Sequence, residues 1–371
     1  MVTLKKENLQ GLLKLWSKEF VVYAPTEEEG EVMLLPYEED KLTLDYINFT
    51  FPVKEFLFKQ REALFKWERK GENIKVETYK DSKNTKKILF GVRSCDAYGI
   101  AYMDKFFLED YVDGNYEQHR DSTYIVATNC VKIGESCFCN SLKIGPFAEV
   151  GYDVLLTPLE DVYLIEIGSK KGEELMALAE DFFEKADELS LDEKNVIQHN
   201  VMKEFKTEIK AHNVHKVLEE NFNNTIWEQL SKDCIRCTGC TMMCPTCTCF
   251  NVVEENNCNN SGCRVRYWDS CQSDSFTRNA GEHNPRNGVS RVRYRIYDKL
   301  KYIEERFNMK GCTGCGRCIK VCPANINIVN IINELSEKGI DIESDLDTLN
   351  SEVASDSEFN KKYSNVEGVK A

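Results

Sequence analysis

The pattern of apolar and polar positions divides the chain into two regions. Up to about residue 220, short apolar or β-branched runs alternate with amphipathic stretches, as in an α/β domain. The runs that predict strands are Phe20–Tyr23, Lys87–Val92, Thr123–Thr128, Val154–Thr157 and Val162–Ile167. Apolar residues at helical spacing predict one helix over Glu173–Leu189. The capping-box spacing of Ser190 and Glu193 predicts a second helix through about Ile209.

The second region is predicted to be mainly helical. Val217–Lys232 and Ser290–Asn308 each lead into a cysteine-rich segment, which makes an internal repeat of roughly 80 residues. From Asp341 to Ala371, eight acidic residues and three lysines predict a solvated, partly disordered tail. We therefore predict an α+β protein, with an α/β domain over 1–215, an α-helical ferredoxin-like domain over 216–338 and the tail over 339–371.

The charge and hydropathy of the chain exclude several classes of partner. Its 371 residues carry a formal net charge of −14, which argues against nucleic acid or an anionic membrane as the general partner. No apolar run approaches the roughly 20 residues of a membrane helix. The first residues lack the pattern of a secretory signal, so we expect a cytoplasmic protein.

The cysteine content changes the picture most. Seventeen cysteines in a chain without an export signal do not predict a disulfide framework, because cytoplasmic thiols are kept reduced. Four lie in the first region and thirteen lie between residues 234 and 322. Binding of a metal or an iron–sulfur cluster is the interpretation that remains.

Two eleven-residue motifs have the cysteine spacing that holds a [4Fe-4S] cluster. They are Cys234-x2-Cys237-x2-Cys240-x3-Cys244-Pro245 and Cys312-x2-Cys315-x2-Cys318-x3-Cys322-Pro323. Three cysteines on a tight loop bind three corners of a cluster, and the fourth binds the other cluster in two-cluster ferredoxins. The predicted ligand sets are Cys234, Cys237, Cys240 and Cys322 for one cluster, and Cys312, Cys315, Cys318 and Cys244 for the other. Tetrahedral zinc does not explain this spacing.

Nine cysteines remain outside these motifs. Two of them directly follow predicted strands, where sites form in open α/β sheets, and two alternate on one side of an extended segment. These four are Cys95, Cys130, Cys137 and Cys139, which form either a third cluster site or small buried apolar groups. Three further candidates for iron, or for core packing, are Cys247, Cys249 and Cys271, with His283 as the nearest fourth ligand. Cys258 and Cys263 are predicted to lie in an Asn-rich loop and to be incidental.

A local excess of positive charge accompanies the motifs. Thirteen Lys and Arg and six Asp and Glu lie between Arg264 and Lys320. Cations of this kind stabilise an anionic cluster and raise its potential, or form a docking face for a partner; nucleic-acid binding is the less favoured alternative. The chain has no dinucleotide or P-loop fingerprint and no nucleophilic or acid–base pattern, so no catalytic residue is predicted.

Several stretches together resemble a known family. They are Arg93-Ser-Cys-Asp96, Glu135-Ser-Cys-Phe-Cys-Asn140, Cys244-Pro-Thr-Cys-Thr-Cys-Phe250, Trp268-Asp-Ser-Cys-Gln272, Gly281-Glu-His-Asn284 and Cys312-x2-Cys315-Gly-Arg-Cys318. In these the chain is similar to the beta subunit of cytoplasmic sulfhydrogenases and to the iron–sulfur subunit of anaerobic sulfite reductases. Phe51–Phe65 and Cys322-Pro-Ala-Asn-Ile326 are closer to the hydrogenase branch.

The resemblance implies an iron–sulfur subunit in an oxidoreductase complex. Its partners would be a flavin subunit that handles NAD(P)H, a terminal hydrogenase or sulfite reductase subunit, and ferredoxin as a further electron carrier. The resemblance also implies that Cys95, Cys130, Cys137 and Cys139 belong to the family pattern. Other classes left open are a self-contained enzyme with an unrecognised flavin pocket and a redox-sensing or scaffold protein.

Overall fold

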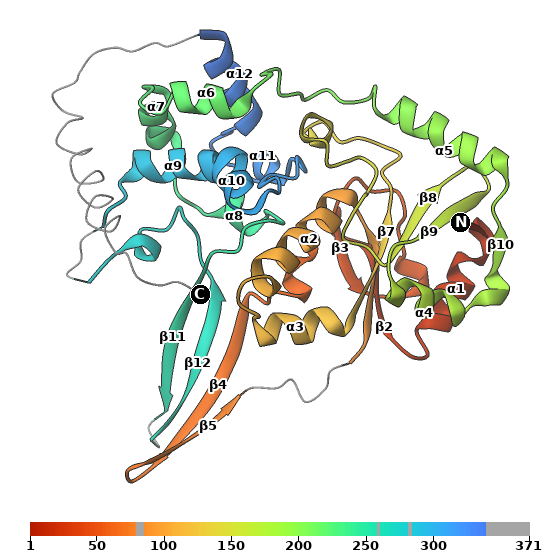
Figure 1. Ribbon diagram of the computed structural model, residues 1–371, viewed down its shortest axis with the longest axis horizontal. Coiled ribbons are helices and arrows are strands. Elements are labelled where there is room, and N and C mark those ends of the chain that lie inside the picture. The colour runs from red at the N-terminus through yellow and green to blue at the C-terminus, as the bar shows by residue number, and fades with distance from the viewer. Residues whose placement is uncertain (79–84, 258–259, 281–283, 339–371) are drawn as a thin grey trace.

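An eight-stranded sheet forms the first half of the chain in this computed structural model, which describes residues 1–78, 85–257, 260–280 and 284–338 (Figure 1). Its strand order is β10 (Phe183–Lys185), β1 (Val2–Lys5), β9 (Val162–Ile167), β8 (Val154–Pro158), β7 (Thr123–Thr128), β6 (Lys87–Val92), β2 (Val21–Glu28) and β3 (Glu31–Pro36). The four strands β2, β6, β7 and β8 are parallel, and the outer strands are antiparallel. The predicted bounds of β6, β7 and β9 are confirmed, because their apolar runs are buried and bounded by polar residues.

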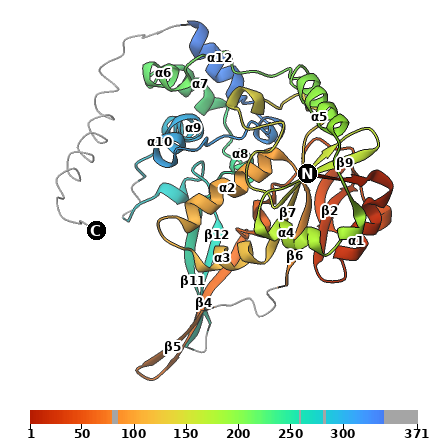
Figure 2. The same cartoon turned by 45° about the vertical axis from the view of Figure 1, so that its right-hand side comes forward.

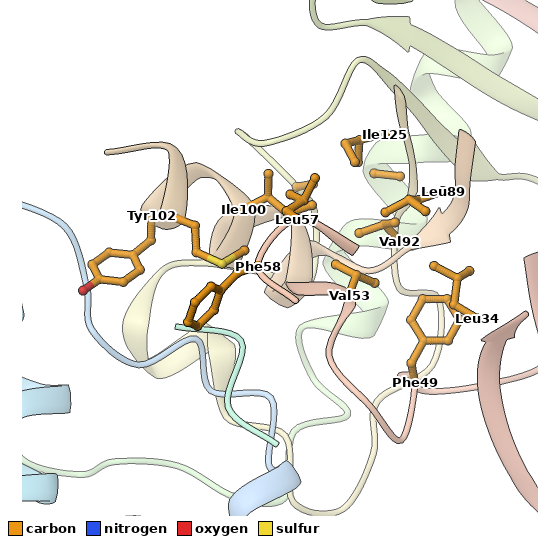
Figure 3. Close-up of a cluster of buried hydrophobic side chains, with 14 of the residues drawn as sticks. Leu34, Phe49, Val53, Leu57, Phe58, Leu89, Val92, Ile100, Tyr102 and Ile125 are labelled. Carbon is orange, nitrogen blue, oxygen red and sulfur yellow. The ribbon is translucent and has the colours of Figure 1, made fainter. Parts of the chain in front are cut away.

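Helices cover both faces of this sheet. On one face, α1 (Leu9–Trp16) and α4 (Lys170–Ala177) pack on side chains such as Ile88 and Phe90. On the other face, α2 (Ser94–Leu108) and α3 (Gly114–Asp121) pack on Leu89 and Ile125, as Figure 3 shows for part of this cluster. The alternating side chains of the central strands thus face two separate apolar cores.

The bend in β6 shows how the sheet accommodates its neighbours. Gly91 has φ +83°, and a Cβ there would lie 2.6 Å from the Tyr46 hydroxyl and 2.7 Å from Pro25. The ladder between β6 and β7 shifts register at this point. Glycine therefore allows a bulge directly before Arg93 and Ser94, where the chain turns from the strand into α2.

A second sheet joins segments from the two predicted domains. Its antiparallel order is β11 (Phe250–Asn257), β12 (Ser261–Trp268), β4 (Arg61–Lys70) and β5 (Asn73–Thr78). In both views the far end of these strands projects from the body as an arm (Figures 1 and 2). The expectation of a mainly helical second region missed the β11–β12 hairpin, which places Cys263 on a strand; Cys258 lies outside the described residues.

The remaining helices form the third core. They are α6 (Val214–Glu220), α7 (Ile226–Asp233), α8 (Gly239–Met242), α9 (Gly288–Tyr297), α10 (Ile303–Phe307), α11 (Arg317–Lys320) and α12 (Ile328–Lys338). A π-helical turn over Asp298–Tyr302 makes α9 and α10 continuous, as the prediction for Ser290–Asn308 requires. Trp227, Tyr297 and Ile332 are central to their shared apolar cluster. The mixed α/β class is confirmed, and none of the described helices is long and apolar enough to cross a bilayer.

Two expectations about the middle of the chain need correction. The helix predicted over Glu173–Leu189 ends at Ala177, because Phe183 begins a strand that pairs with β1. The next helix, α5 (Glu188–Val201), is capped by Asp187, whose carboxylate accepts from the Ser190 amide at 2.9 Å, so the true cap lies three residues before the expected one. The tail predicted over 339–371 lies outside the described residues.

A buried ion pair joins the two halves of the chain. Arg317 of α11 donates to both carboxylate oxygens of Asp96 in α2, at 3.0 and 2.5 Å, and its Nε donates to Phe49 O at 2.6 Å. Both side chains are almost fully buried, at 3% and 0% exposure. Because a bidentate contact satisfies the guanidinium, this pair fixes α11 against α2.

We expect Asp96→Ala to destabilise the fold by about 3–5 kcal/mol, because it leaves the Arg317 charge buried without its partner. Urea unfolding under reducing conditions measures this change. The matched control is Glu109→Ala, which removes an exposed i,i+4 partner of Lys105 and should cost less than about 1 kcal/mol. Equal losses in the two variants would show that the buried pair does not fix the domains.

Candidate iron–sulfur cluster site

The structure brings the three closely spaced cysteines of the first motif together with the last cysteine of the second. Cys234 ends α7, Cys240 lies in α8 and Cys237 lies between them on an exposed loop. These three thiols and Cys322 line one pocket. The sequence separation between Cys240 and Cys322 is bridged because α8 packs against α11. Cys318 of the second set lines the same pocket, so the two sets meet there.

The first set lies on a tight loop, and one of its sulfurs accepts from a backbone amide. Arg236 and Thr238 have φ +57° and +64°, which turns the chain tightly between the cysteines. The amide of Ile326 donates to Cys322 Sγ at 3.3 Å. Hydrogen bonds of this kind stabilise a thiolate ligand and raise the potential of a bound cluster.

The second set lies deeper in the molecule. Cys312, Cys315 and Cys318 all interact electrostatically with Cys244, and the Gly314 amide donates to Cys312 Sγ at 3.4 Å. Burial raises the pKa of each of these three thiols. Cys318 also interacts with Cys240, so the two sets are neighbours.

The four cysteines of the first domain also converge. Cys95 lies in the first turn of α2 after β6, and Cys130 follows β7, so the sheet brings them to the same edge, as expected. Cys95, Cys137 and Cys139 each interact electrostatically with both Cys130 and Cys315. Burial raises the pKa of the Cys137 thiol to about 11. These four thiols thus lie within electrostatic range of one another and of Cys315 of the second set.

Backbone contacts join the loop that carries Cys137 and Cys139 to the loop of the second motif. Phe138 N donates to Gly314 O at 2.8 Å. A Cβ at Gly314 would lie 2.5 Å from Cys139 N, and one at Gly316 would lie 2.4 Å from Ser136 O, and both glycines have positive φ. Only glycine fits this approach, so the glycines of the second motif bring the two cysteine loops into contact.

Each of the other three candidate thiols has a thiol partner. Cys247 hydrogen-bonds to Cys244, and this bond lowers the pKa of Cys244 and raises that of Cys247. Cys271 hydrogen-bonds to Cys249. This bond lowers the pKa of Cys249 to about 7 and raises the pKa of Cys271. His283, the proposed fourth ligand, lies outside the described residues.

Two buried lysines flank the Cys244–Cys247 segment. Lys54 Nζ donates to Cys247 O at 3.0 Å, and Lys299 Nζ donates to Thr246 O at 3.1 Å. They are 2% and 4% exposed, and neither forms an ion pair with a carboxylate among the described residues. Burial lowers the pKa of Lys54. Burial alone would also lower that of Lys299, but the sulfurs of Cys247 and Cys244 raise it well above its usual value. Both lysines therefore interact electrostatically with the sulfurs of Cys244 and Cys247.

The surroundings of the thiols fit an iron–sulfur cluster. Among the described residues, no three His, Cys, Asp or Glu side chains converge closely enough to hold a single metal ion, so the fit depends on the neighbouring donors. The Nε of Arg295 and the hydroxyl of Thr313 are buried without a hydrogen-bond acceptor. Arg295 lines the first pocket, and Thr313 lies between Cys312 and Gly314. The sulfurs of a bound cluster would supply acceptors for these two donors.

Several cationic side chains of the basic segment Arg264–Lys320 are buried rather than exposed. The buried members are Arg266, Arg291, Arg295, Lys299 and Arg317. Of these, Arg295, Lys299 and Arg317 interact with cysteine sulfurs. The local excess of cations therefore fits charge compensation within the sites better than nucleic-acid binding.

Sequence reasoning missed Lys54 and the Arg317–Asp96 pair. Lys54 lies far from any cysteine in sequence, in a short 3-10 helix (Val53–Phe56), and its neighbours gave no signal beyond the Phe51–Phe65 resemblance. Arg317 and Asp96 were each part of a cysteine motif, but only the fold reveals that they meet.

Comparison with known proteins places these sites in a family. Residues 233–326 match a family described as a 4Fe-4S dicluster domain. The chain is 35% identical over 300 residues to sulfhydrogenase 2 subunit beta of Pyrococcus furiosus, and this match covers 80% of the chain and 86% of that protein. No solved structure matches the chain. The dicluster domain contains every cysteine of the two motifs, so the chain belongs to the family of iron–sulfur sulfhydrogenase beta subunits.

Proposed function

We propose that this chain is an electron relay that carries electrons between a flavin subunit oxidising or reducing NAD(P)H and a terminal hydrogenase subunit, in a cytoplasmic complex. The observation that carries the proposal is the order of three cysteine sets. Cys139 of the Cys130 set interacts electrostatically with Cys315, and Cys318 interacts electrostatically with Cys240. The last set ends at the exposed Cys237. Clusters held in this order would form one continuous path through the molecule.

The residues would hold three clusters. Cys234, Cys237, Cys240 and Cys322 would bind the first, and Cys312, Cys315, Cys318 and Cys244 the second. Cys95, Cys130, Cys137 and Cys139 would bind the third. A cluster accepts and releases single electrons, and the protein sets its potential through charge, amide contacts and burial. The chain's own contribution is the set of cations and amides described above, together with the exclusion of water from the two inner sets.

Ligand exchange between the motifs can be tested directly. We expect Cys322→Ala and Cys237→Ala to remove the same EPR signal, because both residues would serve the first cluster. Cys318→Ala should remove a different signal. The measurement is EPR of anaerobically reconstituted, reduced protein, with iron content determined in parallel. Loss of different signals in Cys322→Ala and Cys237→Ala would contradict the crossed arrangement.

The buried Lys299 should set the potential of the second cluster. Lys299→Met removes a positive charge beside Cys244 and so disfavours the more negative, reduced state. We expect the potential to fall by on the order of 60–120 mV, which corresponds to roughly 1.4–2.8 kcal/mol for one electron.

EPR-monitored redox titration measures this shift. Lys301→Met is the matched control, because Lys301 pairs with Glu219 and Glu305 rather than with sulfur. A shift of equal size in the control, or no shift in Lys299→Met at full iron content, would argue against the assignment.

The relay should depend on a flavin partner. A hydride donor gives two electrons together, and single-electron clusters need a flavin to separate them. We expect neither NADH nor NADPH to reduce the isolated chain, while dithionite does, and a flavin-bearing partner subunit should restore reduction by one of the nucleotides. Bleaching of the visible cluster absorbance reports each step. Prompt bleaching of the isolated, flavin-free chain by NAD(P)H would overturn the relay function, and an iron content below about eight per chain would overturn the two-cluster core.

A further inference from the structure

A cavity of about 390 Å³ lies at the base of the projecting arm, and no cysteine of the three sets is among the described residues that line it. Its walls come from α3 on one side and from β4 and β12 on the other, which Figures 1 and 2 show next to one another. The strand β4 belongs to the first half of the chain and β12 to the second. The cavity is therefore built where the two halves meet.

Hydrogen bonds hold the walls of this cavity in place. His119 Nε2 lies 2.6 Å from Glu62 Oε1, and the two side chains are 5% and 6% exposed. The other oxygen of Glu62 accepts from Arg266 Nη2 at 2.7 Å, and Arg266 is 1% exposed. Asn115 of α3 donates to Ala63 O of β4 at 3.4 Å. The cavity is thus formed by residues that the fold already fixes.

Positive charge dominates the lining. Lys59, Arg61 and Lys66 line the cavity together with one carboxylate, that of Glu62, whose two oxygens are already engaged as described. Arg61 also pairs with Glu255 at 2.5 Å, but both side chains of this pair are exposed, and such pairs contribute less than about 1 kcal/mol. A cationic hollow on a chain of net charge −14 concentrates anions at one place.

The residue types of the lining favour a phosphate compound. Lysine ammonium groups and the planar fork of arginine form charge-assisted hydrogen bonds to phosphate oxygens. Asn115 and Gln118 add side-chain amides from α3. The volume lies at the lower end of the range for small-molecule sites. Three lining cations match a diphosphate group, which carries about three negative charges near neutral pH.

We propose that the cavity between α3 and the base of β4 and β12 binds a small diphosphate compound, with Lys59, Arg61 and Lys66 as its charged ligands. Inorganic pyrophosphate and the diphosphate group of an organic molecule share this chemistry. The site is separate from the proposed electron relay and does not depend on it. A bound anion would touch both strands and so stabilise the junction between the two halves of the chain.

The first test is isothermal titration calorimetry of the full chain, reconstituted anaerobically, with pyrophosphate at low ionic strength. We expect one pyrophosphate to bind per chain. Binding should be at least tenfold weaker in the double variant Lys59→Gln, Lys66→Gln, because two attractive charges are removed. Lys75→Gln is the matched control, since Lys75 lies on β5 of the same arm, is exposed and does not line the cavity. It should bind like the unsubstituted chain.

A second measurement locates the anion without relying on the variants. Cys263 lines the cavity, so a bound diphosphate should cover its thiol. We expect iodoacetamide to alkylate Cys263 at least threefold more slowly in saturating pyrophosphate than in chloride of equal ionic strength, as measured by peptide mass analysis. In the double variant, pyrophosphate should leave the alkylation rate unchanged.

Three outcomes would overturn the site: no saturable binding at millimolar pyrophosphate, equal affinity in the double variant, or unchanged alkylation of Cys263 in the unsubstituted chain. Equal affinity for citrate, a carboxylate anion of similar charge, would overturn the assignment to phosphate. Titration with ADP distinguishes the two sources of the group. Tighter binding of ADP than of pyrophosphate would assign the site to an organic diphosphate, and the reverse order would assign it to the inorganic anion; either order supports the site.

Discussion

The buried pair between Arg317 and Asp96 is the contact on which the rest of the arrangement depends. Arg317 lies inside the second cysteine motif, between Cys315 and Cys318, and Asp96 directly follows Cys95. The guanidinium is enclosed, so the two loops gain its full interaction only when they dock in one geometry. That geometry also brings Gly314 and Gly316 against the loop that carries Cys137 and Cys139. One ion pair thereby sets the spacing between two of the proposed cluster sites.

The second sheet also joins the two predicted domains. The strands β4 and β12 pair across the predicted domain boundary, and Lys54 and Phe58 lie just before β4. Lys54 reaches the carbonyls of Thr241 and Cys247 and stacks on the ring of Trp268, 4.2 Å from its centroid. The first domain therefore supplies a second cation to the Cys244–Cys247 segment, beside Lys299 of the second domain. The predicted boundary at residue 215 divides the sequence, but strand pairing crosses it.

Much of the fold was visible in the sequence because its signals are local. The strands Lys87–Val92 and Thr123–Thr128 are buried on both faces, and such strands read as continuous apolar runs. The motif cysteines were equally visible, since their spacing is dictated by the shape of a cluster. The β11–β12 hairpin was not, because its exposed face is rich in Glu, Asn and Arg and it gains its partner only from β4. The pairing of Cys249 with Cys271 was hidden for the same reason, since it follows from the register of that hairpin.

The buried cations and the proposed cluster sites depend on each other for their stability. Lys54, Lys299 and Arg295 are enclosed without carboxylate partners among the described residues, and all three interact with cysteine sulfurs. Without anionic sulfur these cations would carry an uncompensated desolvation cost, and without the cations a cluster with four thiolates would be buried as an unpaired anion. Each is stable inside the protein only in the presence of the other. Formation of the clusters and closure of the two domains should therefore be one coupled process, as expected where ligand residues from distant segments must meet before a metal group can bind.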